Sequence, residues 1–353
     1  MAIRTPEYWA KRFEQLEASQ HNKDVKYYAE VDKLFKAMQA NIKKETDAWF
    51  GRFADNNNIT IQDAKKLLKA GELEEFKWSV NEYIEYGRKH AGDPKWMKKL
   101  ENASVKYHIS RLEALSIHTQ AQAEKAFSEY NDGLDAHLKD VYTNGFYHTA
   151  YEVQKGVDVI SSIVGIDAKT LDQIITKPWT PDGLNFSERV WKSKVQLIDS
   201  VQKEIMKSCI MGQSTHKGVN QLMSLTNAFD KNVKTARSQA ARLIQTESAY
   251  FGALSRQECF KSLDVEQFEV VATLDGRTSE ICREMDGKHF PMNQYEIGVT
   301  APPFHVNCRS TTCPYFDDEF TKDEYRAERG QDGKTHLTMG NITYNEWLKR
   351  MGA

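Results

Sequence analysis

Cysteine and histidine residues that can bind a metal ion gather in the last third of the chain. They are Cys282, His305, Cys308 and Cys313. Thiolate sulfur and imidazole nitrogen are typical zinc ligands, and the His305-x-x-Cys308 spacing lets two of them converge on one ion. Only one tight pair is present, however, whereas the strong zinc signature has two. Because free cysteines are also common in buried cores, we expect no cofactor here and keep a structural zinc site as the alternative.

The same stretch carries side chains with the chemistry of general acids and bases: Glu247, Asp275, Asp286 and His305. The structural alternative is that Asp275 forms a turn and that Arg277 and Arg309 pair with Asp or Glu, for example Glu247. We favour this alternative because charge pairs in small domains are usually structural. The chain has neither a Gly-x-x-x-x-Gly-Lys phosphate loop nor a Gly-x-Ser-x-Gly nucleophile elbow.

Turn signals surround these residues. Asp275-Gly276 and Asp286-Gly287 predict tight turns, and Pro302-Pro303 predicts an extended segment just before His305. The apolar run at 268–272 predicts a strand that leads directly into the first turn. We therefore expect a small domain of short strands and sharp turns, with His305, Cys308 and Arg309 on its final loop or strand.

The preceding two-thirds of the chain shows helical spacing of apolar residues. Helices are predicted at 8–16, 27–53, 60–68, around 76–84, and at 94–127, 142–156, 185–209, 219–225 and 234–259. Asn185 and Glu188 have the spacing of a capping box. The helix at 94–127 fits either an ordinary core-facing helix, which we favour, or one that binds a partner.

These patterns predict an α+β fold with a large multi-helix N-terminal region and a small α+β C-terminal domain. The predicted divisions are a helical region at 1–177, a helical connector at 178–240, the small domain at 241–320 and a tail at 321–353. The Pro- and Gly-containing turn at 178–183 marks the first boundary.

Composition limits the classes of function. A net charge of -2 gives no general attraction to nucleic acid or anionic membranes, and 28% charged with 40% hydrophobic residues is typical of a globular protein. No apolar run approaches the ~18 residues of a membrane span, and the first residues lack the apolar core of a signal peptide. With five cysteines, an odd number, we expect reduced thiols in a cytosol. One local basic stretch allows weak nonspecific DNA contact: Lys95, Lys98, Lys99 and Lys106.

The order of these motifs resembles the signature of the phage head morphogenesis family, the Mu-F-like minor head proteins of tailed bacteriophages. The matching pattern is Asp-x-Arg-Thr, Cys, Asp-Gly, and Pro-Pro-x-His-x-x-Cys-Arg. Its positions here are Asp275, Arg277, Thr278, Cys282, Asp286, Gly287, Pro302, Pro303, His305, Cys308 and Arg309. Upstream, Thr246-Glu247 resembles the end of the family's Arg-Thr-Glu segment, with Gln245 in place of Arg. Ser310 stands where relatives often have another Cys.

The resemblance implies a structural virion protein and not an enzyme. Such proteins enter the phage head in few copies during procapsid assembly, so the expected partners are the portal protein and capsid or scaffold components. The expected location is the virion, with the host cytoplasm during assembly, and neither a membrane nor a small-molecule substrate is expected. The signature residues, including Glu247, would hold the C-terminal domain together.

Two other functions remain open from the residues alone. One is a metal-dependent nuclease or hydrolase that uses His305 with Cys282 and Cys308. The other is a DNA-binding protein that travels with the end of the packaged genome.

Overall fold

A computed structural model describes residues 4–56, 111–210 and 218–316, together with 328–329, 335–336 and 349. The helices predicted at 60–68 and 76–84, the first part of 94–127, and the basic stretch of Lys95, Lys98, Lys99 and Lys106 lie outside the described residues. Among the helices that the structure describes, none has a stretch long and apolar enough to cross a membrane.

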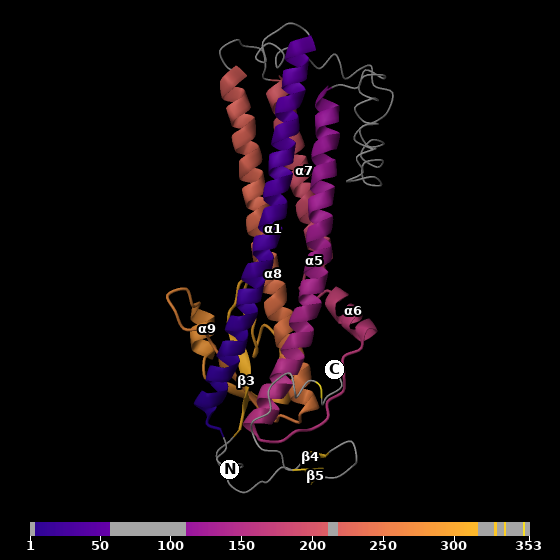
Figure 1. The fold of residues 1–353 in the computed structure, drawn as a ribbon. Helices are drawn as coiled ribbons and strands as arrows, with labels where there is room; N and C mark the ends of the chain where they lie inside the picture. Colours follow the sequence, from indigo (N-terminus) through magenta and orange to yellow (C-terminus); the bar gives the residue numbers. More distant parts are fainter. Residues whose placement is uncertain are drawn as a thin grey trace. The chain divides into compact units, whose positions relative to one another are not determined.

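Long helices make up most of the described chain (Figure 1). They are α1 (Pro6–Asn56), α5 (Arg111–Gly156), α6 (Ala168–Thr176), α7 (Phe186–Ile210), α8 (Gly218–Ser262) and α9 (Glu280–Met285). The strands are β1 (Gln267–Val271), β2 (His289–Pro291), β3 (Thr311–Tyr315), β4 (Glu328–Arg329) and β5 (Thr335–His336), with a short 3-10 helix η2 (Met292–Gln294) before β3. The predicted α+β class, with helices first and a small sheet near the C-terminus, is confirmed.

Several predicted helices merge into longer ones. The predictions at 8–16 and 27–53 are parts of α1, those at 219–225 and 234–259 are parts of α8, and α5 joins the end of 94–127 to 142–156. Within α1, the helical spacing of apolar residues is interrupted between the two predicted helices, because Glu17 and Asp24 occupy buried positions that apolar residues would normally fill. The 17–26 segment contains neither Gly nor Pro, so a helix that has already formed continues through it at little cost.

The helix ends follow local capping chemistry. The capping box at the start of α7 is present: the Glu188 N–H donates to Asn185 Oδ1 at 2.9 Å, and the Asn185 N–H donates to Glu188 Oε2 at 2.8 Å. Asp167 caps α6, which the sequence pattern missed, by accepting the Thr170 N–H at 2.9 Å. Both short helices, α6 and α9, fall below the length at which periodicity is informative.

The chain divides into two compact units, each assembled from separate stretches of sequence. Unit 1 consists of residues 1–28, 134–179 and 242–353, and unit 2 of residues 29–133 and 180–241. The helices α1, α5 and α8 each contribute residues to both units. The domain divisions drawn from the sequence stay predictions.

Unit 2 is a set of helices around an aromatic core. Phe35 packs edge-on against Phe127, with ring centroids 5.0 Å apart, and against Tyr130 at 6.1 Å. Two ion pairs link its helices: Arg237 of α8 contacts Asp32 of α1, and Lys194 of α7 contacts a carboxylate of α5. Burial of the rings supplies most of the stabilisation, because exposed or partly exposed ion pairs contribute little.

Unit 1 contains the small sheet, whose strand order is β2-β1-β3 with both pairings antiparallel. Phe268 of β1 is fully buried and lies in a core with Trp9 and Phe13 of α1 and Phe260 of α8. Phe13 and Phe260 have ring centroids 5.8 Å apart. Three short strands cannot bury a core alone, so the first turns of α1 and the last turns of α8 complete this one.

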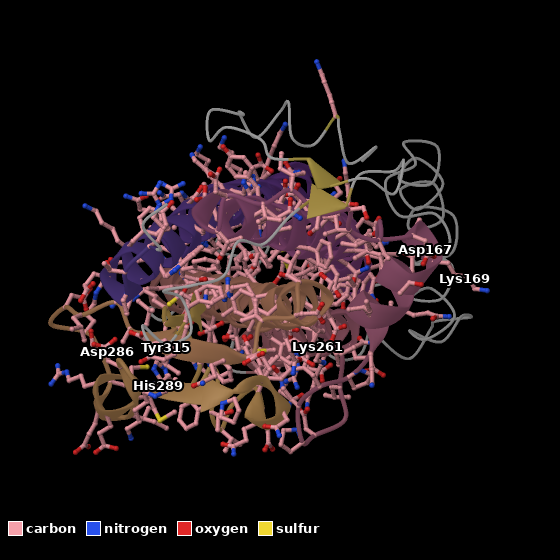
Figure 2. The ribbon with its side chains drawn as sticks, turned by 90° about the horizontal axis from the view of Figure 1, so that it is seen from below. Asp167, Lys169, Lys261, Asp286, His289 and Tyr315 are labelled. Atoms are coloured by element: carbon pink, nitrogen blue, oxygen red, sulfur yellow. The ribbon has the colours of Figure 1, made fainter. Side chains whose placement is uncertain are left out.

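Aromatic stacking also joins the outer strands. His289 of β2 and Tyr315 of β3 stack with centroids 4.2 Å apart and planes 1° from parallel (Figure 2). Between these strands, Glu269 of β1 is paired with His289 on one side and Cys313 on the other. Burial, with Asp286 and Glu7 nearby, raises the pKa of Glu269.

A glycine substitution tests the packing of α1 in unit 1. A Cβ at Gly156, the last residue of α5, would collide with the ring of Trp9, which is 1% exposed. We expect Gly156→Ala to lower the free energy of unfolding by about 1–3 kcal/mol through overpacking. Gly276→Ala is the matched control, because a Cβ there meets nothing within 4 Å. Chemical denaturation measures both, and equal stability of the two variants would contradict the packing of Trp9.

A candidate site of cysteine and histidine beside the sheet

Strand pairing brings the two motif-bearing loops together. In the β1–β3 register Val271 lies opposite Thr311, so the loop that leaves β1 and the loop that enters β3 start at the same end of the sheet. The loops are also joined directly, because Thr273 Oγ1 donates to the Arg309 carbonyl at 3.1 Å. Residues around 275–282 therefore face residues around 305–309.

An ion pair links the loops at their exposed side. Arg309 donates two hydrogen bonds to the Asp275 carboxylate, each 2.7 Å long. The Asp275 carboxylate also accepts the Arg277 N–H at 2.8 Å. The Arg309 hydrogen bonds and the backbone hydrogen bond hold the pKa of Asp275 well below its usual range. Parallel double contacts of this kind are the strong form of an arginine–carboxylate pair.

This geometry settles the partner of Arg309, which is Asp275 and not Glu247. Arg277 is 84% exposed and lies 3.8 Å from Asp275, so its own pairing is loose. Glu247 is 2% exposed on α8 and accepts a hydrogen bond from Trp179 Nε1 at 2.8 Å. Trp179 in turn stacks on Tyr250, with centroids 4.1 Å apart. Glu247 thus fixes the segment that precedes α7.

The other polar signature residues build turns. Thr278 Oγ1 accepts the Asp275 N–H at 2.7 Å and donates to the Thr273 carbonyl at 2.6 Å. The Asp286 carboxylate accepts the Ala272 N–H at 2.7 Å and ties the end of α9 to the end of β1. Gly287 has φ +72, a backbone conformation that favours glycine. The hydrogen bonds of Thr278 and Asp286 thus position the loops.

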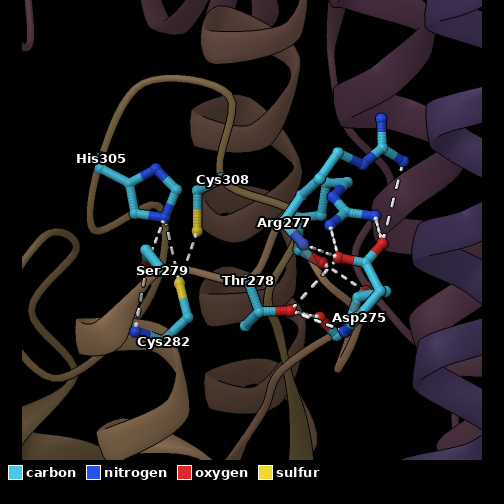
Figure 3. A network of polar contacts seen from close by, with 9 residues as sticks. Asp275, Arg277, Thr278, Ser279, Cys282, His305 and Cys308 are labelled. Atoms are coloured by element: carbon cyan, nitrogen blue, oxygen red, sulfur yellow. Dashed lines mark hydrogen bonds and ion pairs between the residues drawn. The ribbon is translucent and has the colours of Figure 1, made fainter.

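Two thiols and one imidazole converge between the loops. The Cys282 Sγ lies 3.1 Å from His305 Nε2 and 3.7 Å from Cys308 Sγ (Figure 3). The three ligand atoms all lie within 4.8 Å of one another. Cys282 and Cys308 are buried, whereas His305 is half-buried.

Local backbone structure explains this convergence. Ser279 caps α9 by accepting the Cys282 N–H at 3.3 Å, which places Cys282 in the first turn of the helix. On the other loop the Cys308 N–H donates to the His305 carbonyl at 3.2 Å. Asn307 has φ +61 in this tight turn, so His305 and Cys308 approach the same point. Asn307 also donates its N–H to Thr246 Oγ1 of α8 at 3.4 Å, which connects the turn to the helix.

The hydrogen bonds of His305 define its tautomer. Its Nδ1 lies 2.9 Å from the Val306 carbonyl, which only accepts, so Nδ1 carries the proton. Nε2 is then the acceptor, and it faces the Ser279 hydroxyl at 2.8 Å as well as the Cys282 thiol. The imidazole therefore presents a lone pair toward the two cysteines.

The two thiols have different acidities. Burial raises the pKa of Cys282, but hydrogen bonds with the side chains of Ser279, Ser310 and Cys308 lower it by more, so the pKa lies below the usual value. Burial raises the pKa of Cys308 to about 11. Sequence reasoning missed Ser279 and the buried Ser310 as neighbours of the thiols. The signal for Ser279 was its position three residues before Cys282, which is typical of a helix cap.

Cys313 does not join this group among the described residues. It lies in the middle of β3, is fully buried, and belongs to the core that contains Phe13 and Phe268. Burial raises its pKa well above the usual value. The structure thus brings together three of the four candidate metal ligands and places the fourth in the hydrophobic core.

Comparison with known proteins gives one match. Residues 199–313 match the family model described as Phage Mu protein F like protein. The matched stretch contains β1, α9, β2 and most of β3, and with them the ion pair and the cysteine–histidine group. No curated protein and no solved structure matches the chain.

The Asp275–Arg309 pair predicts a pH dependence of stability. Because the folded pKa of Asp275 is depressed, its contribution is fully present above the unfolded value of ~3.9 and is lost as the pH falls through the folded pKa. We expect Asp275→Asn to be less stable than the wild type at neutral pH, with the difference shrinking below about pH 4. Denaturant unfolding across this range measures it.

Glu266→Gln is the control for this prediction, since Glu266 is an exposed carboxylate of the same unit. Its difference from the wild type should stay small at every pH. High salt should reduce the effect of Asp275→Asn, because exposed charge pairs are screened. An Asp275→Asn difference that persists unchanged in acid would show that the carboxylate charge is not what stabilises the loops.

Proposed function

We propose that this chain, whose residues 199–313 carry the region of a Mu-F-like phage head family, is a minor head protein that acts in head morphogenesis. The match indicates a phage head protein and is the observation that carries the proposal. Within head morphogenesis, its proposed role is to bind the portal protein and the inner capsid in few copies, during procapsid assembly in the host cytoplasm. Its location is then the virion, where it acts as a structural component and not as an enzyme.

The construction of the two units supports an adaptor. Unit 1 is held by a mixed aromatic and aliphatic core, and its loops are braced by the Asp275–Arg309 pair. With this core and these braced loops, unit 1 could serve as the rigid part of the adaptor that anchors the protein. Unit 2 is built from long helices, which suit extended contact with a partner.

One large apolar side chain, Val195, is exposed among the described residues of unit 2. Val195 of α7 is 46% exposed, next to the exposed Lys192 and Gln196. Apolar side chains within a polar surround are typical of interface centres, although a lone exposed valine is also ordinary. We assign the portal-binding surface to the helices of unit 2 and use Val195 to test it.

The experiment is co-expression of the full chain with the portal protein encoded in the same phage gene cluster, followed by affinity purification and measurement of Kd. We expect a stable complex, and we expect the chain in purified procapsids and virions by mass spectrometry. Absence from both particles, or failure to bind the portal at micromolar concentration, would overturn the proposal. A DNA-cleavage assay on the same preparation tests the nuclease alternative.

A pair of matched variants locates the surface. Val195→Lys places a charge on α7 and should weaken portal binding by about 10-fold or more, since a charge in an interface centre costs more than 1.4 kcal/mol. Val164→Lys is the control: Val164 is 85% exposed in the segment between α5 and α6 of unit 1. Both variants should keep wild-type thermal stability. Equal effects of the two variants would place the interface elsewhere.

A further inference from the structure

We propose that Cys282, His305 and Cys308 bind a zinc ion, with a water molecule completing a tetrahedral site. This inference concerns the folding of unit 1 and does not depend on the proposed role in the phage head. It rests on the positions of three ligand atoms, on the orientation of the imidazole and on the burial of the group.

The separation of the sulfur atoms fits a zinc site. Two thiolates on a tetrahedral zinc, each at ~2.3 Å, lie ~3.8 Å apart, and a thiolate and an imidazole nitrogen lie ~3.6 Å apart. The Cys282 and Cys308 sulfurs are 3.7 Å apart, which matches the separation expected for two sulfur ligands of one tetrahedral zinc ion. Cys282 Sγ and His305 Nε2, at 3.1 Å, need to separate only slightly. His305 is half-buried on a turn, so its ring can make that adjustment.

The imidazole is already oriented as a ligand. Metal-binding histidines commonly donate the N–H of the second ring nitrogen to a carbonyl or carboxylate, which fixes the tautomer. His305 donates from Nδ1 to the Val306 carbonyl, and its Nε2 lone pair points at the thiols. The hydroxyl of Ser279 lies 2.8 Å from Nε2 and is placed to hydrogen-bond a water molecule in the fourth position.

The choice of zinc follows from the ligand types. Two thiolates and one imidazole, without a carboxylate, suit a borderline-soft ion and exclude calcium and magnesium, which take oxygen ligands. Ala272 and Phe304 pack against the two cysteines, so the sulfur ligands lie in a mostly apolar surround.

The site would act as a clamp between the loops. Cys282 is in the first turn of α9, whereas His305 and Cys308 flank the turn before β3. The ion pair, the hydrogen bond from Thr273 to the Arg309 carbonyl and the contact of Ser279 with His305 also join these segments. A metal at this point offsets the small core of a three-stranded sheet.

Metal content of the purified full chain, produced with zinc in the medium and kept reduced, tests the proposal. We expect about one zinc per chain. Cys282→Ala and Cys308→Ala should each lower the zinc content by about 10-fold or more, since even changes outside the ligand shell cost 10–100-fold in affinity. Cys313→Ala is the matched control, because Cys313 is also buried but lies in the core, and it should retain its zinc.

Two measurements on the wild type cover the case in which the variants fail to fold. A mercurial thiol reagent should release the zinc, detected with a metallochromic dye, because thiolates hold it. Cobalt substituted for zinc should show the strong visible absorption of a tetrahedral site together with thiolate-to-metal charge-transfer bands.

Each opposite result overturns the proposal. If the purified wild-type protein contains no zinc and takes up none when zinc is titrated in, the proposed site does not exist. Equal zinc loss in Cys282→Ala and Cys313→Ala would place the metal elsewhere. A Cys282–Cys308 disulfide in unreduced protein that still takes up no zinc after reduction would make the pair a redox couple instead.

Discussion

The antiparallel pairing of β1 with β3 is the constraint on which the candidate site depends. Its register, with Val271 opposite Thr311, sets where the loops leave the sheet and so which residues meet. Arg309 lies two residues before β3 and Asp275 four residues after β1, and the two meet only in this register. A slip of one residue would turn every side chain of β3 to the opposite face and separate the pair.

That pairing is stable because two helices cover the sheet, one from the start of the chain and one that ends just before β1. β1, β2 and β3 have five, three and five residues, too few to form an independent core. Trp9 and Phe13 reach the sheet from the start of α1, and Phe260 reaches it from the end of α8. The loops of the candidate site are therefore positioned in part by α1, which lies far away in the sequence, and unit 1 cannot be reduced to the matched 199–313 region.

The sequence predicted local features well and long-range partners poorly. Asp-Gly turns, the Asn185 cap and the strand at 268–272 depend on neighbouring residues, and each is present. The length of α1 was wrong because Glu17 and Asp24 are buried: Glu17 pairs with Arg256 of α8 at 3.1 Å, and Asp24 contacts His137 of α5 at 2.8 Å. Such partners lie over a hundred residues away and leave no periodic signal.

The candidate site also combines a local feature that the sequence predicted with a long-range partner that it did not. The His305-x-x-Cys308 spacing indicated that those two residues converge, but nothing in the spacing separated Cys282 from Cys313 as the third. Strand geometry makes that choice: Cys313 lies within β3, where Thr312 and Cys313 alternate between the faces of a covered sheet, so its sulfur is held in the core. Cys282 lies on a helix that begins outside the sheet, and its side chain is free to face the turn that carries His305. The ion pair and the proposed zinc clamp would respond to different conditions, since the exposed carboxylate–guanidinium pair depends on pH and salt, whereas a thiolate-bound zinc would depend on metal supply and redox state.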